Sequence, residues 1–153
     1  MKHLILVLSC ASLLFAGTGC NKECKPKAPA KEVPQITAFA SANGITPTAH
    51  PSGLYYEIIT EGSGQTANAN SAISIIYRGT FLDGRVFDER TTASPAWALS
   101  DLIEGWKIGI PLIKEGGRIK LIVPSSLAYG CEPYLSIPGN SVLYFDISLL
   151  DVQ

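Results

Sequence analysis

The sequence has little of the chemistry that most enzymes use. Its only histidines are His3 and His50, and neither lies in the part of the chain that has the pattern of a folded domain. Ser-His-Asp or Cys-His catalysis and histidine-bound zinc or iron are therefore disfavoured. The glycine patterns of dinucleotide and phosphate-binding loops are also absent, so nucleotide chemistry lacks its usual signatures. We expect no metal and no cofactor.

Positive charge is scarce in residues 33–153. Seven Lys and Arg stand there against eleven Asp and Glu, a net charge of −4. Proteins that bind nucleic acid concentrate basic side chains along one face, because phosphate contacts supply most of the affinity. The composition therefore predicts no nucleic-acid partner.

Residues 1–19 have the pattern of a secretory signal. Lys2 is followed by a mostly apolar run and then by small residues directly before Cys20, and the run is too short for a stable membrane span. The small residues resemble a bacterial lipobox, in which this cysteine is acylated and becomes the new N-terminus. Cleavage before Cys10 would leave a signal of only about nine residues, so we predict Cys20 as the lipidation site. A soluble secreted protein is the alternative.

Residues 20–50 predict an extended, flexible tether, since they are rich in Pro, Ala and Lys and show no helical or strand period. Their lysines are expected mainly to be solvated, although they could also attract anionic headgroups. Within this stretch lies Cys24, and Cys131 lies in the folded part. A bridge between them is conceivable, but nothing local favours closing so long a loop from a flexible stem. We expect Cys131 to be a free thiol.

Residues 51–153 predict a single domain built mainly of strands. Apolar and β-branched residues alternate with polar ones, between glycine-rich turns, in the segments 53–60, 71–81, 85–88, 117–124 and 141–150. Asp83-Gly84 is a hairpin turn signal between two of them.

One helix is expected in this domain, from Ser100 to Ile110, with Ser100 as its N-cap. Gly105 and Gly109 weaken its intrinsic propensity, so packing must hold it. The pattern predicts an α+β domain in which an antiparallel β-sheet wraps around one short α-helix.

Four stretches of the domain make it recognisable: IIYRGTFLDGRVFDER (75–90), PAWALSDLIEGWKIGI (95–110), KEGGRIKLIVPSSLAYG (114–130) and IPGNSVLYFDISLL (137–150). Together they resemble the FKBP-type peptidyl-prolyl cis-trans isomerases, in the family's order and near its spacing. The resemblance implies an aromatic pocket between sheet and helix that receives a proline ring. It also implies an enzyme that acts on Pro-containing polypeptides without cofactor or metal.

The resemblance implies a role for each matching residue. Trp106 would form the pocket floor. Ile103 would offer its backbone N–H to a substrate carbonyl, and the Tyr129 hydroxyl would hydrogen-bond the substrate. Asp88 would accept hydrogen bonds, including one from the Tyr77 hydroxyl. The walls and the rim would be formed by Tyr77, Phe87, Trp97, Phe145 and, at the rim, Ile137.

The sequence departs from the family between Tyr129 and Ile137, where GCEPYLS lacks the usual glycines. We call residues 130–136 the flap, and we expect it to affect substrate preference. The chain has no room for an inserted chaperone domain or a long dimerising helix, so a monomer is expected. A lipoprotein module that binds Pro-containing segments with little turnover is the main alternative, and a purely structural adaptor is a third.

Overall fold

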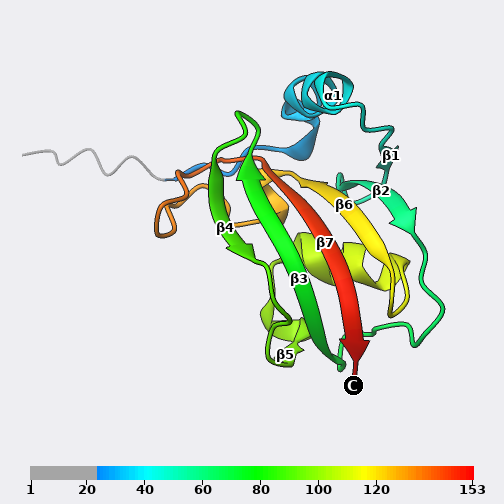
Figure 1. Ribbon diagram of the computed structural model, residues 1–153. Helices are drawn as coiled ribbons and strands as arrows, with labels where there is room; N and C mark the ends of the chain where they lie inside the picture. The colour runs from blue at the N-terminus through cyan, green and yellow to red at the C-terminus, as the bar shows by residue number, and fades with distance from the viewer. Residues whose placement is uncertain (1–23) are drawn as a thin grey trace, which may run out of the picture.

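The computed structural model describes residues 24–153, and these form one antiparallel sheet with helices on both faces (Figure 1). The strands run in the order β1-β2-β6-β7-β3-β4, and β5 pairs with β3. The strands are β1 (Thr48–Ala49), β2 (Tyr55–Thr60), β3 (Ala72–Phe81), β4 (Val86–Arg90), β5 (Trp97–Ala98), β6 (Arg118–Val123) and β7 (Leu143–Val152). The predicted fold class and the predicted strands are confirmed.

The main core lies on one face of the sheet. The alternation in β7 buries Leu143, Phe145, Ile147 and Leu149 there, as the period of two requires. The same alternation in β6 buries Ile119, Leu121 and Val123 on that face. The predicted Asp83-Gly84 turn joins β3 to β4.

The helix that covers this core is shorter than predicted. Only Glu104–Gly109 is α-helical (α2), and the 3-10 helices Leu99–Asp101 (η2) and Ile110–Leu112 (η3) flank it. Ser100 does not cap the helix, because Leu102 and Ile103 are extended and Ile103 is the N-cap residue. A Cβ at Gly105 would lie 2.5 Å from Val123, and one at Gly109 would lie 2.7 Å from Leu121. These glycines let α2 pack directly on β6.

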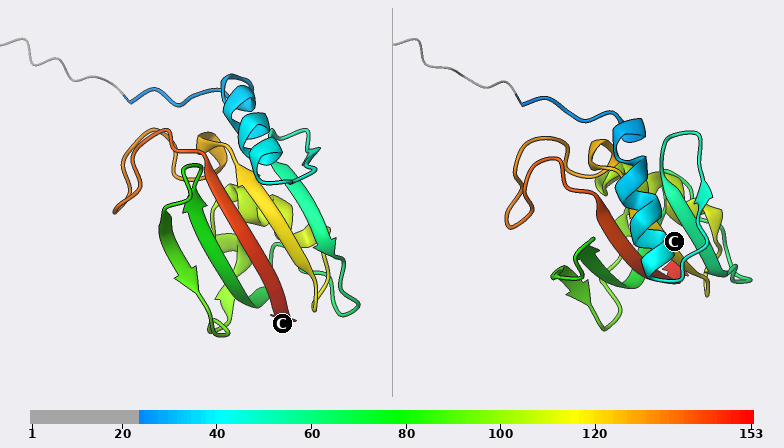
Figure 2. Two further views of the ribbon diagram at one scale, coloured as in Figure 1. Left: turned by 45° about the horizontal axis from the view of Figure 1, so that its top comes forward. Right: turned by 90° about the horizontal axis from the view of Figure 1, so that it is seen from above.

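The structure corrects the predicted flexible tether. Within residues 20–50, a 3-10 helix (η1, Pro29–Lys31) precedes an α-helix, α1 (Val33–Ala42). Figure 2 shows α1 on the opposite face of the sheet from α2. There Ile36, Ala40 and Ile45 form a second buried cluster with Ile122 and Val142. The segment is ordered because burial of this apolar face offsets the entropy lost on folding.

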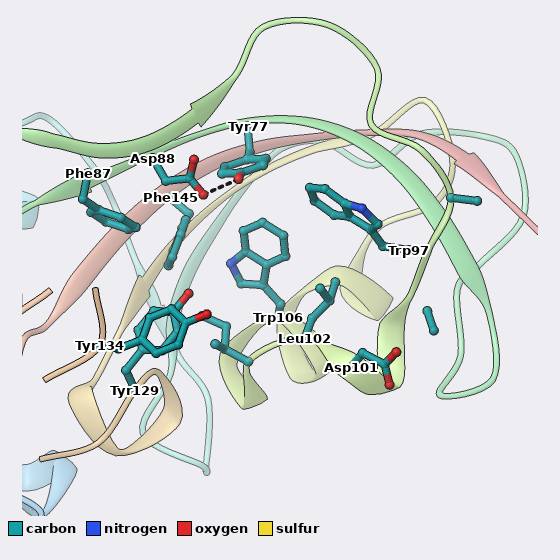
Figure 3. A pocket seen from close by; sticks show the side chains of 13 residues that line it. Tyr77, Phe87, Asp88, Trp97, Asp101, Leu102, Trp106, Tyr129, Tyr134 and Phe145 are labelled. Carbon is teal, nitrogen blue, oxygen red and sulfur yellow. Dashed lines mark hydrogen bonds between the residues drawn. The ribbon is translucent and has the colours of Figure 1, made fainter. Parts of the chain in front are cut away.

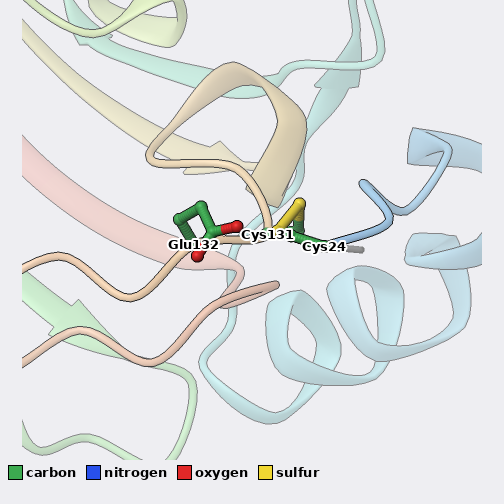
Figure 4. Close-up of side chains that lie close together, drawn as sticks. All are labelled: Cys24, Cys131 and Glu132. Carbon is green, nitrogen blue, oxygen red and sulfur yellow. A yellow bond between two sulfur atoms is a disulfide. The ribbon is translucent and has the colours of Figure 1, made fainter. Parts of the chain in front are cut away.

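The expectation of a free thiol at Cys131 is wrong. Cys24 and Cys131 form a disulfide across a sequence separation of 107, with Cα atoms 5.5 Å apart (Figure 4). The prediction failed because it assumed a flexible stem, whereas η1 and α1 pack against the domain. The backbone N–H of Lys27 also donates to Oδ1 of Asn140 at 3.2 Å.

The predicted signal and Cys20 lie outside the described residues. No helix within residues 24–153 is long and apolar enough to cross a membrane.

Candidate active site

A cavity of about 520 Å³ lies between the sheet and α2 (Figure 3). It is lined by Tyr77, Phe87, Asp88, Ala96, Trp97, Ala98, Asp101, Leu102, Ile103, Trp106, Tyr129, Tyr134 and Phe145. The structure thus brings together eight of the nine residues predicted from the sequence. It adds Ala96, Ala98, Asp101 and Leu102, which the sequence analysis missed, and Tyr134 of the flap.

Trp106 lies at the centre of the cavity's aromatic wall. Its ring meets Tyr77 and Phe145 nearly edge-on, with centroids 5.1 Å away in both cases. Edge-to-face packing is the favoured geometry for aromatic pairs. Trp106 is only 5% exposed and Phe145 only 2%, so both rings are held by packing on the side away from the cavity.

A β-bulge directs two consecutive side chains of β4 into the cavity. Gly79 pairs with Asp88 and Thr80 with Val86, so Phe87 is the extra residue. Neighbouring strand residues normally face opposite sides, and a bulge changes this locally. Phe87 and Asp88 consequently both line the cavity.

Asp88 accepts a hydrogen bond from the Tyr77 hydroxyl, as predicted, with an oxygen–oxygen distance of 2.5 Å. Burial raises the pKa of Tyr77 well above its ordinary value, and the bond to Asp88 raises it further. The phenol therefore stays protonated and remains a donor to the carboxylate.

Trp97 reaches the cavity because β5 pairs with the start of β3, placing Trp97 opposite Ile73. Its ring lies 6.2 Å from that of Tyr77. The guanidinium of Arg90 lies over the same ring, 5.3 Å from its centroid, a cation–π contact that helps to hold the indole in place.

Ile103 lies in the cavity wall at the start of α2. Its carbonyl accepts hydrogen bonds from the N–H groups of Trp106 and Lys107. As the N-cap residue, Ile103 has a backbone N–H that precedes the intrahelical ladder. That N–H is therefore not used by the hydrogen bonds inside α2.

Tyr129 and Tyr134 form a stacked pair at the mouth of the cavity, with ring centroids 4.5 Å apart and an interplanar angle of 7°. Burial raises the pKa of the Tyr129 hydroxyl, with smaller contributions from Tyr134 and Asp88. Tyr134 belongs to the flap, which was expected only to affect substrate preference. Its aromatic ring in an otherwise irregular flap was the signal for a larger role.

Ile137 does not line the cavity, which corrects its predicted place at the rim. It is 5% exposed and belongs to the main core. Its backbone exchanges two hydrogen bonds with Tyr134, of 2.8 and 2.9 Å. Ile137 therefore anchors the flap instead of contacting a ligand.

Ala96, Ala98, Asp101 and Leu102 were missed because each is unremarkable in sequence. Ala96 lies just before β5 and Ala98 ends it, whereas Asp101 ends η2 and Leu102 follows it.

One group of potential metal ligands occurs among residues 24–153: Cys24, Cys131 and Glu132. Both of its sulfur atoms are joined in the disulfide (Figure 4). The thiolates that a metal would need are therefore not available there.

The fold and cavity together define an α+β domain with an apolar, aromatic ligand site under one short helix. The family model described as FKBP-type peptidyl-prolyl cis-trans isomerase matches residues 63–150. The chain belongs to this family.

Several relatives resemble the chain over much of its length. The FKBP-type peptidyl-prolyl cis-trans isomerase FkpA of Buchnera aphidicola subsp. Acyrthosiphon pisum is 41% identical over 116 residues, which cover 74% of this chain and 47% of the relative. FkpA of Escherichia coli strain K12 is 38% identical over 117 residues, covering 75% and 43%. The chain thus spans less than half the length of these relatives.

Solved structures share the fold. The crystal structure of FkpA from Escherichia coli superposes with a TM-score of 0.72 at 33% identity, covering 82% of this chain and 61% of that one. AtFKBP13 gives a TM-score of 0.64 at 30% identity, covering 71% of this chain and 99% of that one.

Proposed function

We propose that this protein is a peptidyl-prolyl cis-trans isomerase that accelerates the folding of Pro-containing envelope or secreted polypeptides. The observation that carries the proposal is the cavity itself, in which Trp106 packs between Tyr77 and Phe145 beside the Tyr77–Asp88 hydrogen bond. Its volume of about 520 Å³ accommodates a prolyl ring with its neighbouring peptide groups.

The chemistry of this reaction suits such a site. Rotation about an X-Pro bond meets a barrier of about 18–20 kcal/mol that arises from amide resonance, and the uncatalysed reaction takes tens to hundreds of seconds. Twisting the imide ends the resonance and reduces the charge on its carbonyl oxygen. An apolar cavity stabilises the twisted imide relative to the planar one, and each 1.36 kcal/mol of that difference gives about a tenfold rate increase.

The polar groups at the edge of the cavity would orient the substrate. The Ile103 N–H would donate to a carbonyl on the C-terminal side of the proline, and the Tyr129 hydroxyl would donate to a second carbonyl. Asp88 would hold the Tyr77 ring and supply a fixed negative charge beside the rotating imide. Phe87 and Trp97 would complete the walls. These contacts hold both peptide flanks while the imide rotates.

A protease-coupled assay with a peptide containing Leu-Pro tests the proposal, with a protease-free NMR exchange measurement as its control. We expect the purified protein to accelerate isomerisation and the Trp106→Ala variant to lose most of that acceleration. If the protein binds the peptide without accelerating exchange, it is instead a module that captures Pro-containing segments.

We also propose that the protein is a monomer held at a membrane of the bacterial envelope by acyl chains on Cys20. The signal pattern of residues 1–19 supports this proposal. Intact-mass measurement of the mature protein tests it. A mature N-terminus at Cys20 with the added mass of acyl chains is expected, and any other N-terminus would contradict the anchor. Sedimentation in detergent tests the monomeric state.

A further inference from the structure

Glu32 is fully buried although it lies well before the residues that match the family model. Its side chain has 0% exposure. Oε2 accepts a hydrogen bond from the backbone N–H of Ser125 at 2.9 Å, and Oε1 accepts one from the Ser125 hydroxyl at 2.8 Å. Ser125 is itself only 1% exposed. A buried carboxylate needs such donors, so the two residues fix each other's position.

Ser125 in turn fixes the backbone on both sides of Tyr129. It begins the 3-10 helix η4 (Ser125–Leu127). Its carbonyl accepts hydrogen bonds from the N–H groups of Ala128 at 3.1 Å and Gly130 at 2.8 Å. Tyr129 lies between those two donors. Its ring position at the mouth of the cavity therefore depends on where Ser125 is held.

Two further contacts join the N-terminal segment to the same loop. The disulfide attaches Cys24 to Cys131, two residues after Tyr129, and Lys27 donates to Asn140. The Asn140 N–H donates to the Gly130 carbonyl at 2.8 Å. In Figure 4 the N-terminal segment meets the flap at Cys131, where the disulfide is drawn. All the attachments converge on the loop that carries Tyr129 and Tyr134.

We propose that Glu32 is a positioning residue for Tyr129, so that the segment before the family's catalytic unit completes the isomerase site. The proposal rests on the proposed isomerase function. It assigns Glu32 no contact with substrate. Glu32 acts through Ser125, and Tyr129 makes the contact.

The first test is kinetic and uses the full-length protein with an X-Pro peptide. Glu32→Ala lowers kcat/KM about threefold to tenfold, the equivalent of one well-placed hydrogen bond. Glu32→Gln restores it to within about twofold, since the amide can accept from the Ser125 N–H and donate to its hydroxyl. Ile36→Ala is the matched control, because it removes a buried side chain of α1 that packs on the other face of the sheet. It lowers stability and leaves kcat/KM unchanged at temperatures where the protein is folded.

A double-mutant cycle separates positioning from general loss of structure. In a Tyr129→Phe background, Glu32→Ala changes kcat/KM by less than about twofold, because the hydroxyl that Glu32 positions is already gone. An equal loss in both backgrounds overturns the proposal. If Glu32→Ala does not fold, Ser125→Ala replaces it in the cycle, since that change removes only one of the two hydrogen bonds.

The second test does not depend on isomerase activity. Hydrogen exchange of the Gly130 amide, which is bonded to the Ser125 carbonyl, becomes at least about tenfold faster in Glu32→Ala. Exchange of the Trp106 amide, which is bonded to the Ile103 carbonyl, does not change. Unchanged Gly130 exchange overturns the positioning role even if the enzyme is active. Faster Gly130 exchange in a protein without isomerase activity supports the positioning and contradicts the proposed function alone.

Discussion

The Tyr77 hydroxyl and the Asp88 carboxylate meet diagonally across two adjacent strands. Gly79, which has no side chain, is the direct partner of Asp88, and Tyr77 lies two residues before Gly79 on the same face. The carboxylate therefore reaches Tyr77 over the glycine, at 2.5 Å. The register of β3 and β4 thus sets the charge at the edge of the cavity.

Substitutions of Asp88 should change kcat/KM much more than they change stability. We expect Asp88→Ala to lower kcat/KM about tenfold or more, since a charge-assisted hydrogen bond that orients Tyr77 is lost. The melting temperature should change little, because Asp88 is exposed. Asp88→Asn retains an acceptor for the Tyr77 hydroxyl, so its kcat/KM should lie between those of the wild type and Asp88→Ala. Full turnover in a folded Asp88→Ala protein would remove this residue from the site.

Two neighbouring flap residues should behave differently. Tyr134 stacks on Tyr129, so Tyr134→Ala should lower kcat/KM for every X-Pro peptide by about twofold to tenfold, the value of an aromatic pair. Leu135 is 90% exposed and has a φ of 49°, which a glycine adopts without strain. Leu135→Gly should leave stability equal or higher and change only the ranking of peptides with Leu, Ala or Glu before proline. If steady-state assays show instead that Leu135→Gly lowers kcat/KM for every peptide and Tyr134→Ala changes only their ranking, then Leu135 supports the site.

The disulfide should contribute strongly to stability, because it closes a loop with a sequence separation of 107. The chain-entropy account gives roughly 4–5 kcal/mol for a loop of this length. We expect reduction, or the Cys24→Ser/Cys131→Ser double change, to lower the urea midpoint accordingly. Reductant should not affect the double variant. An unchanged midpoint in reduced wild-type protein would contradict the expectation.

Stability should fall in alkali through Tyr144, which packs against Phe39 of α1. Burial, followed by repulsion from Asp146, raises the pKa of Tyr144 from 10.0 to about 12. The folded protein holds this proton more tightly than the unfolded chain does. This contribution is therefore complete below pH 10 and is lost as pH rises through about 12. As pH rises above 10, the urea midpoint of Tyr144→Phe should fall less than that of the wild type. An equal fall with pH in the two proteins would exclude the effect.

The strands and most of the site were predictable from local pattern. Alternation specified the core face of β6 and β7, and the four motifs specified Trp106, Tyr77 and Asp88. The back face was harder, because Ile122 and Tyr144 interrupt an otherwise polar row with only two residues. Read alone, they do not indicate a covering helix, although both pack in the cluster around α1.

Residue pairs that are far apart in the chain could not be predicted from the sequence either. Glu32 and Ser125 are separated by 93 positions, and Cys24 and Cys131 by 107. No periodicity encodes such pairs, and a Pro- and Ala-rich composition hides a short helix that is stabilised only by tertiary packing. Ile137 was misplaced because motif position does not specify which way a side chain points.

The disulfide at Cys24 also limits how far the proposed lipid anchor can let the enzyme travel. A tether ending at residue 50 would have allowed an excursion of roughly 100 Å from the bilayer, at about 3.5 Å per extended residue. Since Cys24 is already fastened to the domain, only the link from an acylated Cys20 remains, about 14 Å at full extension. The catalytic domain would work against the lipid surface itself, on chains that emerge from or pass along the membrane. It would have little access to proteins in the open compartment.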